Sequence, residues 1–253
     1  MTPGDADFSP GPLRYTFLVI ANDGRPVLKP TAAVTLARSQ KGAPFEHATA
    51  TLEPIGVRGV SVAPQGVPSI YVVHLHVPAA GTYWVRAQPA GAAISGIGNV
   101  IVRASSFSPA VGSKAIDSRT PTLATTGGRL ASLTTATHPD RALYTTSVAT
   151  ALARHDPFVL TFATPKFCTS RTCGPVVDVV SYVRRHTAKR VAFIHVEVFA
   201  GNDPAKGYNR WMKEWHLESE PWVFVVGGDG RIDAKFEGSV SVGELTSAVR
   251  ALR

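Results

Sequence analysis

The feature that most limits how this chain can fold is a short segment that holds its only two cysteines, Cys168 and Cys173. The apolar run 157–163 precedes this segment, and a helical apolar pattern over residues 176–183 follows it. The two sulfurs are therefore predicted to lie where a buried strand ends and a helix begins. A helix start offers unpaired N–H groups and positive dipole character, which favour the reactive thiolate over the thiol.

The spacing of the cysteines restricts how they can be arranged, because four residues separate them. In one regular helix they would lie about 7.5 Å apart along the axis, whereas a disulfide needs Cα atoms closer than about 7 Å. We therefore expect Cys168 in the loop before the helix and residues 169–172 folded back. Pro175 fits the first helical turn, where its missing N–H costs nothing. Redox or metal chemistry and a plain stabilising bridge both remain open.

Length and strand pattern indicate two domains. The chain has 253 residues, of which 44% are hydrophobic, enough for two cores. Residues 13–103 contain about seven short strand patterns broken by glycine and proline, and no helical period. This pattern is typical of an all-β immunoglobulin-like sandwich, which we place at residues 8–104.

The remainder of the chain has a different character. Residues 105–144 are rich in Ser, Thr, Pro, Gly and Ala, which predicts a linker or a segment wrapped over the next domain. Residues 145–253 alternate between strand and helix patterns in the order βα, βα, ββ, α. This order predicts a C-terminal α/β thioredoxin fold, so the expected fold class is an immunoglobulin-like sandwich followed by a thioredoxin fold.

Charge and hydropathy exclude some classes of protein. The net charge is +8, but the basic residues are scattered and no aromatic–basic stripe accompanies them, so we expect no nucleic-acid partner. Peripheral contact with an anionic membrane or cell wall stays open. No apolar run reaches the length of a membrane span, and the first residues do not form a signal peptide. We expect either a cytosolic chain or, preferably, one trimmed behind an export signal or lipid anchor.

Three stretches carry a resemblance to a known family. They are residues 162–175 with both cysteines, Glu220-Pro221-Trp-Val-Phe-Val-Val, and Gly228-Asp-Gly-Arg-Ile with the following Phe236-Glu-Gly. From about residue 108 onward the chain resembles the extracytoplasmic thioredoxin-like proteins of bacterial envelopes, the TlpA-like group, here with an N-terminal immunoglobulin-like domain. The resemblance implies a secreted or membrane-anchored protein with a cis-proline at Pro221 beside the cysteines.

The chain departs from the family pattern in two places. Four residues separate the cysteines where the family has two, and Phe162 stands where the family usually has a buried acid. Glu197, on the same strand face as His195, is a candidate replacement that could accept the proton of the resolving thiol. A structural role for His195 and Glu197 at the strand end is the equal alternative. The side chain of Glu220 could also face the sulfurs, and Arg171 could lower a thiol pKa by its charge.

These observations support three hypotheses. The first is an extracytoplasmic thiol–disulfide oxidoreductase without a cofactor, in which Cys168 attacks a disulfide of a partner protein, Cys173 resolves the mixed disulfide, and Pro221 and Glu197 complete the site. The second is a chaperone that binds copper through Cys168, Cys173 and His195, because the wide cysteine spacing also resembles Sco-type copper chaperones and thiolates favour Cu(I). The third is a binding module with a structural disulfide.

Overall fold

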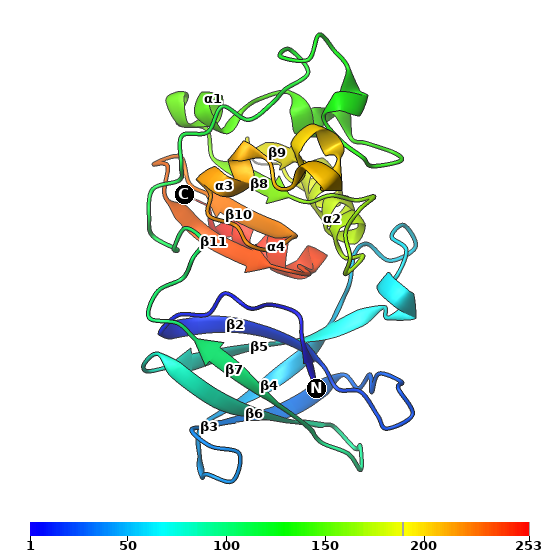
Figure 1. Cartoon of the computed structure of the whole chain (residues 1–253), viewed down its shortest axis with the longest axis vertical. Coiled ribbons are helices and arrows are strands. Elements are labelled where there is room, and N and C mark those ends of the chain that lie inside the picture. The colour runs from blue at the N-terminus through cyan, green and yellow to red at the C-terminus, as the bar shows by residue number, and fades with distance from the viewer. Residues whose placement is uncertain (189, 253) are drawn as a thin grey trace. The chain divides into compact units, whose positions relative to one another are not determined.

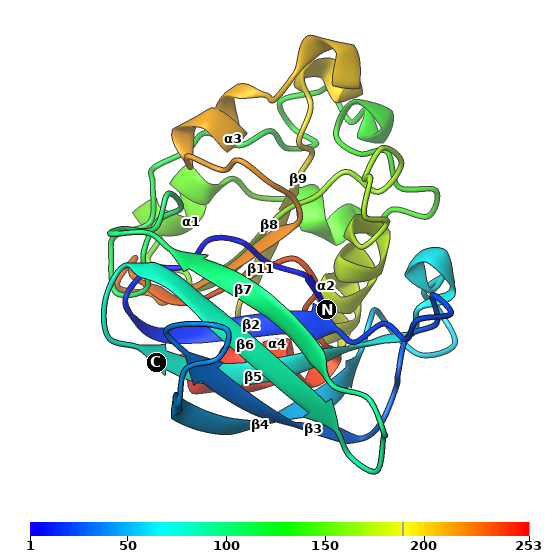
Figure 2. The ribbon, with the colours of Figure 1, turned by 60° about the horizontal axis from the view of Figure 1, so that its bottom comes forward.

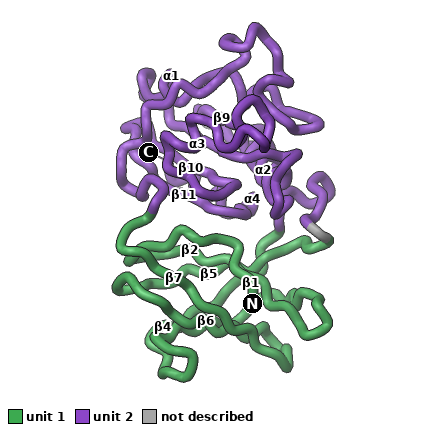
Figure 3. The backbone as a smooth tube through the Cα atoms, viewed as in Figure 1, with its two compact units in different colours: residues 1–54, 66–106 green, residues 55–65, 107–253 purple. Residues whose placement is uncertain are grey.

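The computed structural model describes residues 1–188 and 190–252, without the side chain of Gln65. Lys189 and Arg253 lie outside the described residues, and Arg253 is the last residue of the predicted second domain. The chain divides into two compact units (Figure 3): residues 1–54 with 66–106, and residues 55–65 with 107–253. Residues 55–65 thus belong to the second unit, although the chain on both sides of them belongs to the first.

The first unit is one antiparallel sheet of seven strands (Figures 1 and 2), in the order β1-β2-β5-β4-β3-β6-β7. Alternate residues of its strands point into one core, where the rings of Tyr15, Phe17 and Tyr71 stack with centroids 5.5 and 5.2 Å apart. The strands are β1 (Thr2–Pro3), β2 (Gly11–Leu18), β3 (Thr31–Ala37), β4 (Pro44–Pro54), β5 (Ser69–Val77), β6 (Gly81–Pro89) and β7 (Gly96–Val102); a 3-10 turn, η1 (Pro64–Gly66), precedes β5.

The second unit contains a mixed sheet of four strands in the order β11-β10-β8-β9. The strands β8 (Phe158–Phe162) and β9 (Ala192–Val196) are parallel, and β10 (Trp222–Val226) runs antiparallel to both β8 and β11 (Ile232–Glu237). The central strands β8 and β10 are buried along their whole length. Both faces of this sheet are therefore covered, as a continuous apolar run predicts.

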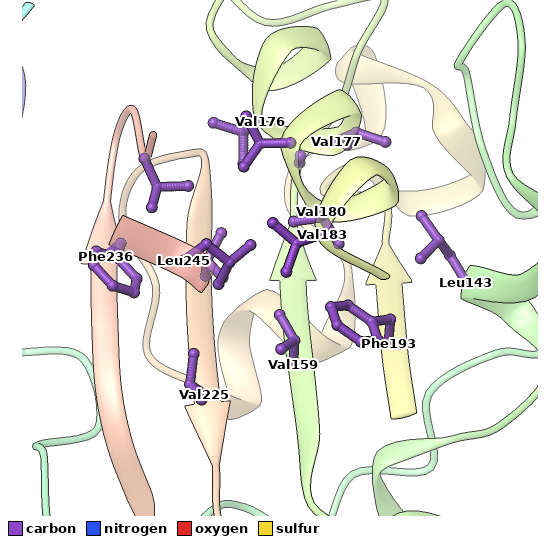
Figure 4. Close-up of a cluster of buried hydrophobic side chains, with 14 of the residues drawn as sticks. Leu143, Val159, Val176, Val177, Val180, Val183, Phe193, Val225, Phe236 and Leu245 are labelled. Atoms are coloured by element: carbon purple, nitrogen blue, oxygen red, sulfur yellow. The ribbon is translucent and has the colours of Figure 1, made fainter. Parts of the chain in front are cut away.

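Helices cover the two faces of this sheet. Valines of α2 (Cys173–His186) pack with Leu245 of α4 (Val242–Ala251) against Val159 and Val225 (Figure 4). The short helices α1 (Val148–Ala153) and α3 (Arg210–Glu214) contribute to a second cluster with the opposite residues of the same strands, such as Leu160 and Phe224. Because α2 is anchored along its whole length, the cysteine at its first position is held in a fixed place.

Residues 107–144 pack onto the second unit without forming long regular elements. Leu133, Leu143 and Tyr144 are buried in the same cluster as the α2 valines. A bridge between Lys114 and Arg231 adds the segment to the edge of β11. Besides η2 (Leu130–Ser132) and η3 (Arg141–Tyr144) in this segment, the unit has two 3-10 turns after β9, η4 (Ala200–Asn202) and η5 (Pro204–Lys206).

The predicted fold class is wrong for the first unit. An immunoglobulin-like sandwich has two facing sheets, whereas this unit is one continuous sheet that curls nearly into a barrel. The reason is β4, which pairs with both β3 and β5 and so joins strands that a sandwich would separate. Little in the sequence marks β4 as a strand, because Ala and Thr alternate in it rather than large apolar and polar residues. The weak alternation of residues 56–63 predicts a strand, but these residues form a turn and bend segment of the second unit.

The second half of the expected fold class needs correction as well. The chain is mostly β, with 20% of its residues in helices, and does not form a clear α/β thioredoxin fold. The sequence after Asn202 and Asp203 predicts a helix from Pro204 to Trp215, but only η5 and α3 form there, because Gly207 has a φ of 67° between them. Among the described residues, no helix combines the length and the apolar character that a membrane span requires.

A core substitution tests whether residues 107–144 are an integral part of the second unit. Leu143→Ala removes a fully buried side chain, and we expect it to lower the free energy of unfolding by about 2–5 kcal/mol, because the cavity does not collapse completely. Urea unfolding followed by tryptophan fluorescence measures this, since Trp211, Trp215 and Trp222 lie in this unit. The control Val111→Ala, at a side chain that is 56% exposed, should change it by less than about 0.5 kcal/mol. Equal effects of the two variants would contradict the packing described.

Candidate functional site

The two cysteines lie in a tight turn between β8 and α2. The backbone N–H of Cys168 donates to the carbonyl of Thr164 at 3.1 Å, and the N–H of Arg171 donates back to the carbonyl of Cys168 at 3.2 Å. Cys173 is the first residue of α2, and Pro175 lies in its first turn. The predictions of a loop position for Cys168, a folded-back segment after it and a helix start at the second cysteine are confirmed.

The cysteines differ in their access to solvent. Both are free thiols, and Cys173 is fully buried under the turn. Cys168 is 8% exposed and lines a cleft of about 870 Å³ that lies within the second unit. Cys168 is therefore the more accessible of the two sulfurs, as its position in the loop before the helix predicts.

Glu220 completes a group of three side chains. One ligand atom each of Cys168, Cys173 and Glu220 lies within 4.8 Å of the other two. The Oε2 atom of Glu220 accepts hydrogen bonds from the Cys173 thiol at 3.3 Å and from the N–H of Thr164 at 3.0 Å. The partly buried carboxylate thus holds both the Cys173 thiol and the turn that carries the other sulfur.

Strand pairing explains why Glu220 reaches the cysteines. The first residue of β10, Trp222, pairs with the last residue of β8, Phe162. The residues just before β10 therefore lie beside the turn that follows β8. The Glu220–Pro221 peptide bond is cis, as predicted, and Pro221 is buried at the entry to the strand.

Hydrogen bonds make Cys168 acidic. The largest cause is the hydrogen bond from the Cys173 side chain; burial works against it, and the Ser170 hydroxyl and the backbone N–H groups of Cys173 and Thr172 add to it. Together they lower the pKa of Cys168 to about 5. Hydrogen bonds to the charged form, rather than the charge of Arg171, account for the shift. Above pH 5 the accessible sulfur is a thiolate.

The other two groups of the site shift in the opposite direction. Burial raises the pKa of Cys173 most, and the hydrogen bond to Cys168 and the negative charges of Glu220 and Cys168 raise it further. Burial and the Cys168 charge raise the pKa of Glu220 to about 7, although hydrogen bonds from Cys173 and Thr164 oppose the shift. The Glu220 carboxyl group therefore gains or loses its proton near neutral pH, whereas the neighbouring Cys173 thiol stays protonated.

The ring nitrogens of His195 bind groups next to the cysteine turn and not the sulfurs. It is buried on β9, with Nδ1 2.7 Å from the hydroxyl of Tyr144 and Nε2 2.9 Å from the carbonyl of Ala163. Both ring nitrogens are therefore engaged, and burial lowers the pKa of the imidazole. The hydrogen bond to Ala163 fixes the backbone next to Thr164, whose N–H binds Glu220.

Glu197 also lies away from the thiols. Its Oε1 atom accepts hydrogen bonds from the N–H and the hydroxyl of Thr135, at 2.5 and 2.8 Å. The same hydroxyl accepts a hydrogen bond from the N–H of Lys166 in the turn. Glu197 thus ties the cysteine turn to the loop around residue 135. Glu220, not Glu197, is the carboxylate that binds the Cys173 thiol.

Comparisons of this chain with protein-family models, with curated proteins and with solved structures found no match. The resemblance to the TlpA-like group, the extracytoplasmic location and the expected partners therefore stay predictions. The site itself rests on its geometry alone.

The acidity of Cys168 can be measured directly. We expect iodoacetamide to alkylate Cys168 at a rate that rises as the pH passes through about 5 and is lost below it, because only the thiolate reacts. Cys173→Ala removes the strongest hydrogen bond to the thiolate and should move this midpoint upward, and Ser170→Ala should move it less. Mass spectrometry of quenched samples gives the rates. A midpoint at the ordinary pKa of a thiol in the parent chain would contradict the geometry.

Proposed function

We propose that this protein is a thiol–disulfide oxidoreductase in which Cys168 attacks and Cys173 resolves. The observation that carries the proposal is the contrast between the two sulfurs. Cys168 is an accessible thiolate at neutral pH, whereas Cys173 is buried, protonated and hydrogen-bonded to a carboxylate. An attacking thiolate and a resolving thiol beside a proton acceptor are the two parts that exchange requires.

The first step uses Cys168. Its thiolate attacks one sulfur of a partner disulfide, so that a mixed disulfide forms and the other partner sulfur leaves as a thiolate. The low pKa keeps Cys168 charged without assistance, because Cys173, Ser170 and two backbone N–H groups hold the thiolate. The same stabilisation makes Cys168 a good leaving group in the reverse reaction.

The second step uses Cys173 and Glu220. Once Cys168 is in the mixed disulfide, its negative charge is gone, and the Cys173 thiol keeps Glu220 as its hydrogen-bond acceptor at 3.3 Å. Glu220 takes the proton, and Cys173 attacks the Cys168 sulfur. The Cys168–Cys173 disulfide forms and the second partner thiol is released, so the partner is reduced and this protein is oxidised. The reverse sequence oxidises a partner dithiol.

The copper hypothesis loses its third ligand in this geometry. His195 is held by Tyr144 and Ala163, and the group that joins the sulfurs is the carboxylate of Glu220. A hard oxygen donor is not what Cu(I) prefers. Copper binding through the two thiolates stays an untested alternative. If copper does bind, His195→Ala should leave its affinity unchanged under a competing chelator.

The reduction potential separates exchange from a structural bridge. Hydrogen bonds that stabilise the Cys168 thiolate favour the dithiol form, so we expect a potential above about −300 mV, the value below which structural disulfides usually lie. A lower potential would favour the binding module with a structural disulfide.

The role of Glu220 can be tested by Glu220→Gln, which keeps the size of the side chain but removes its basicity. We expect ring closure to slow by about 10²-fold, the lower range for loss of a general base. In the parent chain its rate should rise with pH through a midpoint below about 7, because the Cys168 charge that helps to raise the pKa of Glu220 is gone in the mixed disulfide. The reaction is followed by rapid mixing of reduced protein with a disulfide that releases a coloured thiol, whose first and second equivalents report the two steps.

A neighbouring glutamate supplies the control for this experiment. Glu218→Gln changes an exposed side chain two residues away, and the rate of ring closure should stay within twofold of the parent. The variant Cys173→Ser should release only the first equivalent of the coloured thiol and should accumulate as the mixed disulfide on Cys168. Ring closure in Glu220→Gln at the parent rate would remove Glu220 from the mechanism, and absence of the first equivalent in the parent chain would overturn the proposed function.

A further inference from the structure

The cleft beside Cys168 has features of a binding site that exchange alone does not require. Residues of α2 that lie three, four and seven positions apart form one face of the helix and line the cleft. These are Gly174, Val177, Asp178, Ser181, Arg184 and Arg185. The face spans about 16 Å along the helix, which matches about five residues of an extended chain.

One wall of the cleft is the segment of residues 55–65. Its Val57 is buried in the cluster that contains the α2 valines. The Ser61 hydroxyl accepts a hydrogen bond from the N–H of Val57 at 2.9 Å and donates to Asp178 of α2 at 2.7 Å. Gly56, with a φ of 79°, lies so close to Pro175 that an added Cβ would be 2.9 Å from the proline Cβ. The segment is therefore a fitted wall with defined contacts to α2.

This wall presents apolar side chains to solvent. Val60 and Val62 both line the cleft and are 64% and 85% exposed. They are the two most exposed of the large hydrophobic residues in the described part of the chain. Val57 and Ser61 hold the turn that carries these two valines, so the valines are exposed while the turn is in its folded position. Exposed apolar side chains beside a nucleophile are typical of a surface that a partner covers.

The charge of the cleft is predominantly positive. Its only two acidic residues among the described side chains are Asp140 and Asp178. Asp140 pairs with Arg184 at 2.8 Å and with Arg185 at 3.7 Å, and Asp178 accepts the hydrogen bond from Ser61. Five side chains with a permanent positive charge line the cleft, four arginines and one lysine: Arg141, Lys166, Arg171, Arg184 and Arg185. A ligand that complements the lining is therefore negatively charged.

We propose that this cleft binds an extended acidic segment of a partner protein, with an apolar side chain against Val60 and Val62 and the partner disulfide at Cys168. This inference rests on the proposed function and adds to it a substrate class, which is an acidic, partly apolar chain that flanks a disulfide. A small disulfide has the reactive bond but not the flanking chain, so it makes only part of these contacts.

Peptide disulfides of opposite charge test the substrate class. Two peptides are compared that share one disulfide and one flanking leucine and differ only in carrying glutamates or lysines. We expect the reduced parent chain to react with the acidic peptide at least tenfold faster, in second-order rate constant, than with the basic peptide or with glutathione disulfide. The preference should shrink as salt is added, because added ions screen exposed charges. Equal values for the two peptides would overturn the proposal.

Two pairs of variants assign the effect to the cleft. Val62→Ser should lower the second-order rate constant for the acidic peptide about three- to tenfold, whereas Val111→Ser, at an exposed valine outside the cleft, should stay within twofold of the parent. Arg185→Ala should act like Val62→Ser, but only on the acidic peptide. Its control is Arg190→Ala, at a side chain that is 90% exposed and does not line the cleft. Variants in the cleft that behave like their controls would also overturn the proposal.

A binding measurement distinguishes failure of the cleft from failure of the chemistry. The double variant Cys168→Ala and Cys173→Ala cannot exchange, and fluorescence anisotropy of a labelled acidic peptide without cysteine measures its binding. Saturable binding that Val62→Ser weakens would support the proposed binding cleft. If the parent chain then reacted with none of the disulfides, only the proposed function would be overturned. Absence of binding together with normal exchange would overturn the cleft alone.

Discussion

The proton of Cys173 is the interaction on which the site depends. Cys173 is fully buried and protonated, and its thiol lies between two acceptors, the Cys168 sulfur and the Glu220 carboxylate. When the thiol stabilises the Cys168 thiolate, it lowers the pKa of that sulfur. In the exchange we propose, Cys168 becomes covalently bound to a partner, and only the carboxylate then remains as an acceptor. One proton can therefore serve both proposed steps, and its position is controlled by the charge on Cys168.

This arrangement requires that three distant parts of the chain meet. The cysteine turn follows β8, Glu220 precedes β10, and these two strands pair so that Trp222 lies opposite Phe162. The parallel neighbour β9 contributes His195, which holds the Ala163 carbonyl beside the turn. The strong burial of β8 and β10 fixes this register, because a slip by one residue would exchange the two apolar faces of each strand. Packing of the sheet thus sets the geometry of the thiols.

The local features of the site could be predicted from the sequence, because they depend on neighbouring residues. The apolar run, the proline after Cys173 and the proline before β10 indicated the strand end, the helix start and the cis bond. The choice of carboxylate could not be predicted in the same way. Glu197 and Glu220 both had a position near the expected sheet edge, and only the contacts of Thr135 and Thr164 decide which of them turns toward the sulfurs. The fold class failed for a related reason, since Ala and Thr side chains in β4 gave no apolar alternation to mark the strand that unites the first sheet.

The segment of residues 55–65 shows how a feature invisible in the sequence can shape function. Its alternating pattern resembled a strand, but Gly56 and the Ser61 hydroxyl turn the chain against α2 instead. In this position Val57 enters the core of the second unit, which leaves Val60 and Val62 on the surface beside Cys168. The chain thus leaves the first sheet after β4, contributes a wall to the cleft and returns to begin β5. In the proposed reaction this wall adds the apolar side chains of Val60 and Val62 to a cleft whose other residues include Lys166 and Arg171 of the cysteine turn and residues of α2.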